Sequence, residues 1–157
     1  MNKTAFVFII FALVLGFAAC SSDNAPKPPP SVSTAELAEL VRETVTFPAM
    51  VEHTGEDIET FIGLKLGYAE EITVFQQALT MHLVEIIIVR PEEGSMSNIM
   101  QFLQDRQAHL KEISALYPMQ QAAVEAMVVG SKSGFAYLIC HEDAPAAEKA
   151  LSDFLSQ

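Results

Sequence analysis

Apolar positions along the chain recur with two periods, one helical and one strand-like. Four segments carry their apolar side chains on one stripe at helical spacing, each begun by a residue that can cap a helix. These helical segments are residues 33–45, 54–62, 95–116 and 143–154. Four other segments are alternating or continuously apolar, as strands are. These strand-like segments are residues 70–77, 83–90, 123–129 and 135–140.

The segment 83–90 has the clearest strand pattern. Residues 84–89 are β-branched at five of six positions, with Glu85 as the exception, which favours a strand buried on both faces. The link from residues 70–77 to this strand contains neither Gly nor Pro. By contrast, Gly130 and Gly134 flank the polar loop of the second pair, which is typical of a hairpin.

The order helix, helix, strand, strand, helix, strand, strand, helix is typical of an α+β domain. We predict two layers, in which helices cover one face of a four-stranded, mainly antiparallel sheet made of two hairpins. The linear order leaves open which strands are neighbours.

The longest uncharged apolar run lies between Lys3 and Cys20. A basic start, a short apolar stretch and small residues before a cut site are the features of a secretory signal. Cys20, directly after two alanines, resembles the lipobox of bacterial lipoproteins, which implies that Cys20 becomes the lipidated first residue of the mature chain. An uncleaved anchor is the alternative, but the run is shorter than the ~20 residues that span a bilayer. We predict residues 1–19 as a lipoprotein signal peptide.

Four prolines lie within residues 21–33, three of them consecutive. They impose extended polyproline geometry, and at ~3.1 Å per residue the segment reaches ~40 Å. Residues 20–33 are therefore predicted as a lipidated cysteine and a Pro-rich tether. Residues 34–157 are predicted as a single globular α+β domain, which is long enough to bury a core.

Nine basic and 20 acidic residues give the 157-residue chain a formal net charge of −11. Loss of residues 1–19 would remove Lys3 and leave −12. Such acidity argues against nucleic acid as a partner, because its phosphates would be repelled, and against docking on anionic lipid through a basic patch. Attachment to the membrane would instead depend on the N-terminal lipid, which would include palmitate.

Five short motifs lie in and beside the predicted strands and the long helix. They are Tyr68 to Ile72, Glu85 to Val89, Phe102 to Arg106, Tyr117-Pro118 and Gly134 to Ile139. Through these motifs, residues 37–155 resemble the bacterial lipoprotein family catalogued as domain of unknown function 4358. The resemblance implies an extracytoplasmic, lipid-anchored bacterial protein, and it supplies no activity, ligand or catalytic residue to carry over.

Arg106 is the candidate contact residue for a ligand or partner. It lies between Leu103 and Leu110, close to the apolar stripe of the long helix. A guanidinium at such a position must find a carboxylate or extend to solvent. One interpretation is a structural ion pair, and the other is a site that grips an acidic ligand or an acidic group of a partner.

No motif typical of catalysis is visible. The sequence has no Gly-x-Ser-x-Gly motif, no phosphate-binding glycine loop and no two histidines at ligand spacing on a helix. His141, Glu142 and Asp143 concentrate ligand atoms, but a capped helix start explains them equally well. Cys140 lies in an apolar run and is interpreted as a buried small hydrophobe. We therefore expect no catalytic residue, no metal and no cofactor, and a protein that is not an enzyme.

These observations favour a lipid-anchored domain on the extracytoplasmic side of the cell membrane that binds another envelope protein or serves envelope assembly. The alternative is a small solute- or metal-binding lipoprotein that supports uptake, and an envelope hydrolase with an unfamiliar site is the third hypothesis. An exposed apolar patch without a pocket would favour the first. A pocket joining Arg106 to a carboxylate and an aromatic ring would favour the second.

Overall fold

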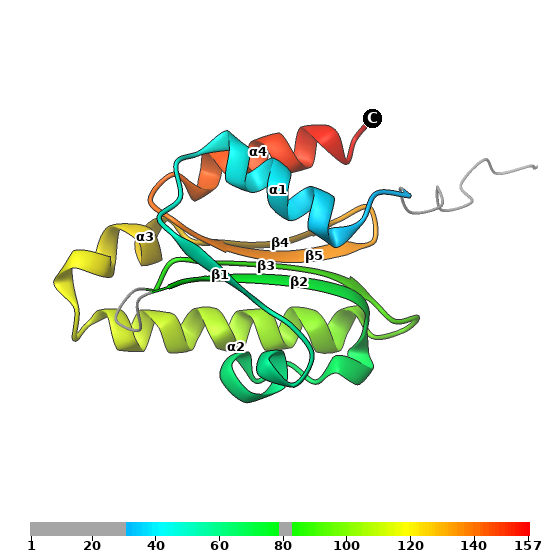
Figure 1. Cartoon of the computed structure of the whole chain (residues 1–157), viewed down its shortest axis with the longest axis horizontal. Helices are drawn as coiled ribbons and strands as arrows, with labels where there is room; N and C mark the ends of the chain where they lie inside the picture. The colour runs from blue at the N-terminus through cyan, green and yellow to red at the C-terminus, as the bar shows by residue number, and fades with distance from the viewer. Residues whose placement is uncertain (1–30, 79–82) are drawn as a thin grey trace, which may run out of the picture.

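Five strands form one antiparallel sheet in the computed structural model of the protein, which describes residues 31–78 and 83–157. In sheet order they are β1 (Met50–His53), β2 (Ala69–Gln77), β3 (Glu85–Pro91), β5 (Phe135–Cys140) and β4 (Val128–Lys132). Every neighbouring pair is antiparallel, and β3 lies at the centre (Figure 1). The predicted signal peptide (residues 1–19), Cys20 and most of the predicted tether lie outside the described residues.

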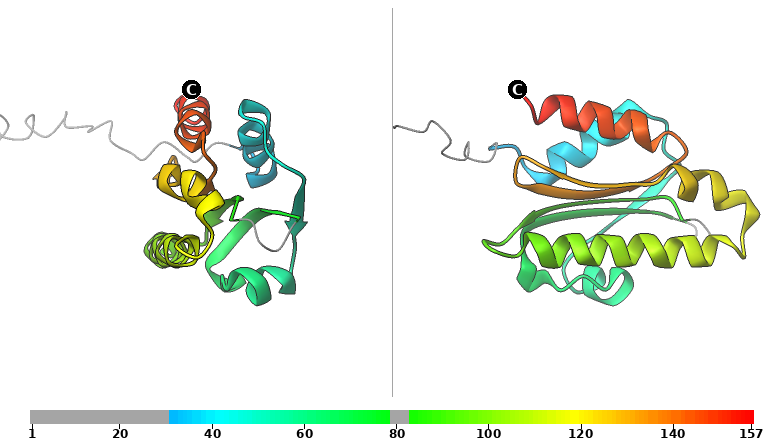
Figure 2. Two further views of the ribbon diagram at one scale, coloured as in Figure 1. Left: turned by 90° about the vertical axis from the view of Figure 1, so that its left-hand side faces the viewer. Right: turned by 180° about the vertical axis from the view of Figure 1, so that it is seen from behind.

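Helices lie on both faces of the sheet, as the two views of Figure 2 show. α1 (Thr34–Thr44) and α4 (Ala144–Phe154) pack side by side on one face, and α2 (Met96–Ser114) covers the other. The shorter helical elements are η1 (Ile58–Ile62), η2 (Leu66–Tyr68), η3 (Pro118–Gln120) and α3 (Gln121–Ala126). The α+β class is confirmed, but the prediction of two layers was wrong, because there are three.

The third layer follows from the central strands, whose side chains are apolar on both faces. Ile86 and Ile88 pack toward α1 and α4, whereas Ile87 and Val89 pack toward α2, and all four are completely buried. Residues of β5 alternate between the two cores in the same way. The predicted burial of residues 84–89 on both faces is confirmed, and it requires a cover of helices on each side.

The sheet has five strands rather than the predicted four, and β1 is the strand that the sequence analysis missed. β1 has four residues, and its two central ones, Val51 and Glu52, are exposed, so it shows no apolar alternation. Its pairing with β2 runs from Met50 opposite Gln77 to His53 opposite Val74. β1 is therefore an edge strand that tertiary pairing defines.

The predicted strand over residues 123–129 was also wrong. Residues 121–126 form the alanine-rich helix α3, and β4 begins only at Val128. β4 and β5 are joined by Ser133 and Gly134, whose φ angles of 48° and 85° are those of a tight type I′ turn. The second hairpin therefore exists, but its first strand lies later in the chain than predicted.

The two ends of the sheet carry different parts of the chain. The tether end holds residues 31–34, the start of β2, the end of β3 and the turn at 133–134, which contacts Leu155 after α4. The far end holds Gln77, the start of β3 and the end of β5. α2 runs from the tether end to the far end, where η3 and α3 follow it (Figure 1).

Gly130 on β4 is required by the close approach of Tyr137 on β5, its partner in the register. The Tyr137 ring is buried, and its hydroxyl donates to Oε1 of Glu148 at 3.0 Å. Burial, and then Glu148, raise the pKa of Tyr137 to about 12. A Cβ on residue 130 would lie 2.5 Å from the Tyr137 Oη. Only glycine leaves room for this buried ring.

Gly130→Ala is expected to lower the free energy of unfolding by about 1–3 kcal/mol, because the buried ring of Tyr137 must shift. Ser131→Ala, at the next and exposed position of the same strand, should change stability by less than about 0.5 kcal/mol. Urea unfolding of both variants measures the difference. A Gly130→Ala variant as stable as Ser131→Ala would show that the strand does not need this glycine.

Candidate functional site

Arg106 forms a buried, bidentate ion pair with Glu85. Arg106 on α2 donates from Nε to Oε1 of Glu85 at 2.9 Å and from Nη2 to Oε2 at 2.7 Å. Glu85 is completely buried, and the Arg106 side chain is 12% exposed. Burial by itself would lower the pKa of Arg106, but the hydrogen bonds and charge of Glu85 raise it above its ordinary value. The guanidinium therefore stays charged, and its contacts lie within the domain.

Gln76 and His53 extend this ion pair toward the edge of the sheet. Gln76 donates from Nε2 to Oε2 of Glu85 at 3.2 Å, and its Oε1 lies 3.1 Å from Nε2 of His53. Because an amide oxygen only accepts, His53 is the donor. The His53 ring lies 5.7 Å from the ring of Phe61, which is exposed on η1. One polar chain therefore runs from α2 through β3 and β2 to β1.

Cys140 lies opposite Glu85 in the sheet and is completely buried. Its Sγ donates to the carbonyl oxygen of Ala123 at 3.6 Å. Burial, and then the charge of Glu85, raise the pKa of Cys140 to about 12, so the thiol stays protonated at neutral pH. The interpretation of Cys140 as a buried small hydrophobe is confirmed.

A pocket of about 370 Å³ opens at the far end of the sheet. Its lining combines apolar side chains from the segment before β1, from η3 and from α3 with polar groups that follow β5. Among the lining residues are Phe47, Pro48, Met119, Ala122, His141 and Glu142. We call this the far-end pocket. Arg106 does not line it, so the ion pair and the pocket are separate features.

His141 is the most enclosed polar group of the far-end pocket, with 6% of its surface exposed. The backbone N–H of Asp143 donates to its Nδ1 at 3.0 Å, so the neutral ring carries its proton on Nε2. The ring centroid lies 4.5 Å from that of Phe47. Within residues 31–78 and 83–157, no group accepts a hydrogen bond from Nε2, which leaves one donor at the pocket wall.

Two large apolar side chains that follow α2 are exposed, and one of them, Met119, lines the far-end pocket. Met119 in η3 is 89% exposed, and Leu116, three residues earlier, is 74% exposed. Methionine is flexible and polarizable and adapts to irregular apolar surfaces. The described residues contain no group of three His, Cys, Asp or Glu side chains that could hold a metal ion, His141 to Asp143 included.

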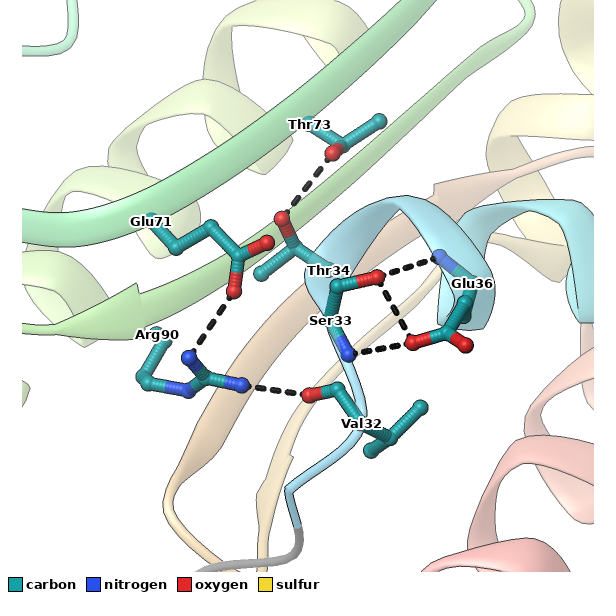
Figure 3. Close-up of polar contacts among 7 residues, drawn as sticks. All are labelled: Val32, Ser33, Thr34, Glu36, Glu71, Thr73 and Arg90. Atoms are coloured by element: carbon teal, nitrogen blue, oxygen red, sulfur yellow. Dashed lines mark hydrogen bonds and ion pairs between the residues drawn. The ribbon is translucent and has the colours of Figure 1, made fainter.

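The tether end fastens the entering chain to the sheet through a set of polar contacts, which we call the clamp (Figure 3). Arg90 at the end of β3 donates from Nη2 to the carbonyl oxygen of Val32, and its Nη1 lies 2.9 Å from Oε2 of Glu71. The hydroxyls of Thr34 and Thr73 share a buried hydrogen bond of 2.9 Å. Residues 32–34 are therefore part of the folded body.

The capping residue predicted at the start of residues 33–45 is confirmed, because Ser33 begins α1 with a capping box. The backbone N–H of Glu36 donates to Oγ of Ser33 at 3.1 Å, and Ser33 N–H donates to Oε2 of Glu36 at 2.8 Å. The Ser33 hydroxyl also donates to Oε2 of Glu36 at 2.8 Å. The hydrogen bond from the Ser33 backbone, and then that from its hydroxyl, lower the pKa of Glu36. The cap sets where α1 begins, directly beside the clamp.

Comparison with known proteins places the chain in a family. A family model described as a domain of unknown function (DUF4358) matches residues 43–141, which is more than half of the chain. The chain belongs to this family. The resemblance inferred from the sequence motifs is thereby confirmed at the level of the domain. No curated protein and no solved structure matches the chain.

The DUF4358 match covers the buried polar chain and most of the far-end pocket. His53, Gln76, Glu85, Arg106 and His141 all lie within residues 43–141. Residues 32–34 of the clamp and the whole of α4 lie outside the match. In the described part of this DUF4358 protein, no helix has both the length and the apolar character needed to cross a bilayer.

Sequence reasoning found one half of the buried site and missed the other. It singled out Arg106 but not Glu85, although an isolated acid within a buried strand signals that a partner is needed. It considered His141 only as a metal ligand, beside Glu142 and Asp143. It did not consider Phe47, because the contact between residues 47 and 141 is far too distant in sequence to show in a local pattern.

Removing both members of the ion pair should destabilise the domain by less than the two single removals do together. Glu85→Leu or Arg106→Met alone leaves an unpaired buried charge and is expected to cost about 3–5 kcal/mol. The double variant should lose clearly less than the sum of the two single losses. Urea unfolding of the three variants measures this coupling.

The exposed pair Arg42 and Glu39, 2.5 Å apart on α1, serves as the matched control. The same double-variant cycle at this pair should give a coupling below about 1 kcal/mol, because solvent screens both charges. Additive losses at Glu85 and Arg106 would contradict the assignment of a coupled buried pair.

Proposed function

We propose that this DUF4358 protein is a bacterial lipoprotein whose domain binds another envelope protein on the extracytoplasmic side of the membrane and catalyses no reaction. The lipobox-like sequence around Cys20 and the Pro-rich residues 21–33 support the anchor. The membrane is then reached through the N-terminal lipid, and the acidic surface takes no part in it. The signal peptide, residues 1–19, is removed on lipidation of Cys20.

The observation that carries the proposal is that the clamp and the exposed apolar side chains lie at opposite ends of the sheet. The clamp joins residues 32–34 to the tether end. The exposed Leu116 and Met119 follow α2, which runs to the far end (Figure 1). A body tethered in this way presents its far end away from the membrane. Large apolar side chains exposed beside a pocket are typical of surfaces that bind proteins.

A second function is favoured by the far-end pocket itself. Its volume of about 370 Å³ suits a small solute, as expected of a solute-binding lipoprotein that supports uptake. The pocket, however, does not include Arg106, the residue that sequence analysis proposed for ligand contact. The exposed apolar side chains of Leu116 and Met119 are more than a small solute needs, so protein binding remains the proposed function.

The anchor is tested by Cys20→Ser in the organism that carries the protein. We expect this variant to lose labelling by tritiated palmitate and to move from the membrane fraction to the soluble extracytoplasmic fraction, because serine offers no sulfur for the lipid. Cys140→Ala, which changes the other cysteine of the chain, should retain both the palmitate label and its place in the membrane fraction. A labelled, membrane-bound Cys20→Ser protein would refute the lipoprotein assignment.

Protein binding is tested by photo-cross-linking in intact cells. A photoreactive residue at Met119 is expected to capture one envelope protein reproducibly, because the far end carries the partner surface. The same residue at Phe154, an exposed apolar position near the tether end, is the matched control. Equal capture at both positions, or none at Met119, would contradict binding through the far end.

A further inference from the structure

The far-end pocket indicates what part of the partner the protein binds. This inference rests on the proposed protein-binding function. We propose that the pocket takes an extended peptide segment of the partner that inserts one apolar side chain and places a Lys or Arg beside it. The pocket thereby recognises a short sequence motif that contains one apolar residue and one basic residue. Three features of the described residues support this assignment: the size and walls of the pocket, the Nε2–H donor of His141 at its wall, and its charge.

The size and walls fit an inserted side chain. A volume of about 370 Å³ lies at the lower end of the range of ligand sites. Phe47, Pro48 and Ala122 supply rigid apolar walls, and the exposed Met119 supplies a wall that can move to fit the entering group. A Leu, Met or Phe side chain would lose its contact with water here, which is the driving force for binding.

The Nε2–H donor of His141 fits the peptide backbone next to the inserted apolar side chain. His141 Nδ1 is held by the Asp143 N–H, so the ring is fixed and presents Nε2–H as its second polar group. A donor at a pocket wall can bind a carbonyl oxygen of a ligand, and the backbone of an extended peptide offers one at every residue. Insertion of a side chain against Phe47 brings such a carbonyl toward His141, because the two rings are in contact.

The negative charge around the pocket favours a Lys or Arg next to the inserted apolar side chain. Glu142 is the charged residue among the lining residues that the structure describes. Across the segment Thr46–Pro48, which both hollows share, a groove of about 430 Å³ is lined by Glu39, Arg42 and Glu43. Arg42 is paired with Glu39, which leaves the charge of Glu43 available to a partner. Anionic ligands are repelled, and Lys or Arg is attracted.

The test uses the full-length protein and an array of short acetylated and amidated peptides on a Gly/Ser background. One set combines Leu, Met or Phe with Lys at varied spacing. A second set replaces Lys with Glu, and a third replaces the apolar residue with Ser. We expect the first set to bind at least about tenfold more tightly than either of the others, because each loses one of the two recognised groups.

Variants on the exposed surface of α3 locate the binding. Ala122→Phe fills the pocket from an exposed position and is expected to weaken peptide binding by at least about tenfold. Gln121→Phe, an exposed neighbour outside the pocket lining, should bind as the unchanged protein does. Glu43→Gln with Glu142→Gln should remove the preference for Lys over Glu and leave the apolar requirement in place.

The outcomes separate this inference from the proposed function. Equal binding of the three sets, no binding, or equal effects of Ala122→Phe and Gln121→Phe would overturn the peptide assignment. Self-association of the protein that Ala122→Phe abolishes would assign the pocket to a second copy and overturn it as well. If capture from Met119 in cells persists in any of these cases, the protein-binding function stands without the peptide motif.

Discussion

The ion pair between Glu85 and Arg106 is the interaction on which the rest of the structure depends. Glu85 begins the central strand of a sheet that is buried on both faces, so its carboxylate has no route to water. The only charged side chain that meets it comes from α2 among the residues the structure describes. The pair therefore joins α2 to the start of β3 at the far end of the sheet. The position of α2 in turn places Leu116 and Met119 beyond the far end.

The same constraint explains the three layers. Because residues 86–89 of β3 and all of β5 are buried and largely apolar, neither face of the central sheet tolerates water. α1 and α4 cover one face, and α2 with η1 and α3 covers the other. Hydrophobic burial is non-directional, so it requires that both faces be covered but does not choose which helix covers which face. That choice comes from specific contacts such as Arg106 with Glu85 and Thr34 with Thr73.

Much of the fold could be predicted because its larger elements have long periodic patterns. The long helix, predicted over 95–116, spans Met96–Ser114, and the capping box at Ser33 starts α1 as expected. The failures are short elements with little pattern of their own. β1 has two exposed residues at its centre, and residues 121–126 are apolar enough for a strand but rich in alanine, which favours a helix. For β1, pairing with the neighbouring strand β2 decided the structure.

What the sequence by itself determined is local: the helical and strand periods, the cap at Ser33, the acidic balance, and the need of Arg106 for a partner. What only the tertiary structure decided is which distant residues meet. Residues 47, 119 and 141 form one pocket, and residues 32 and 90 form one clamp, although nothing in their neighbouring residues relates them. The physical reason is that periodicity encodes which face of an element is buried, whereas the partner of that face depends on packing between segments far apart in the chain.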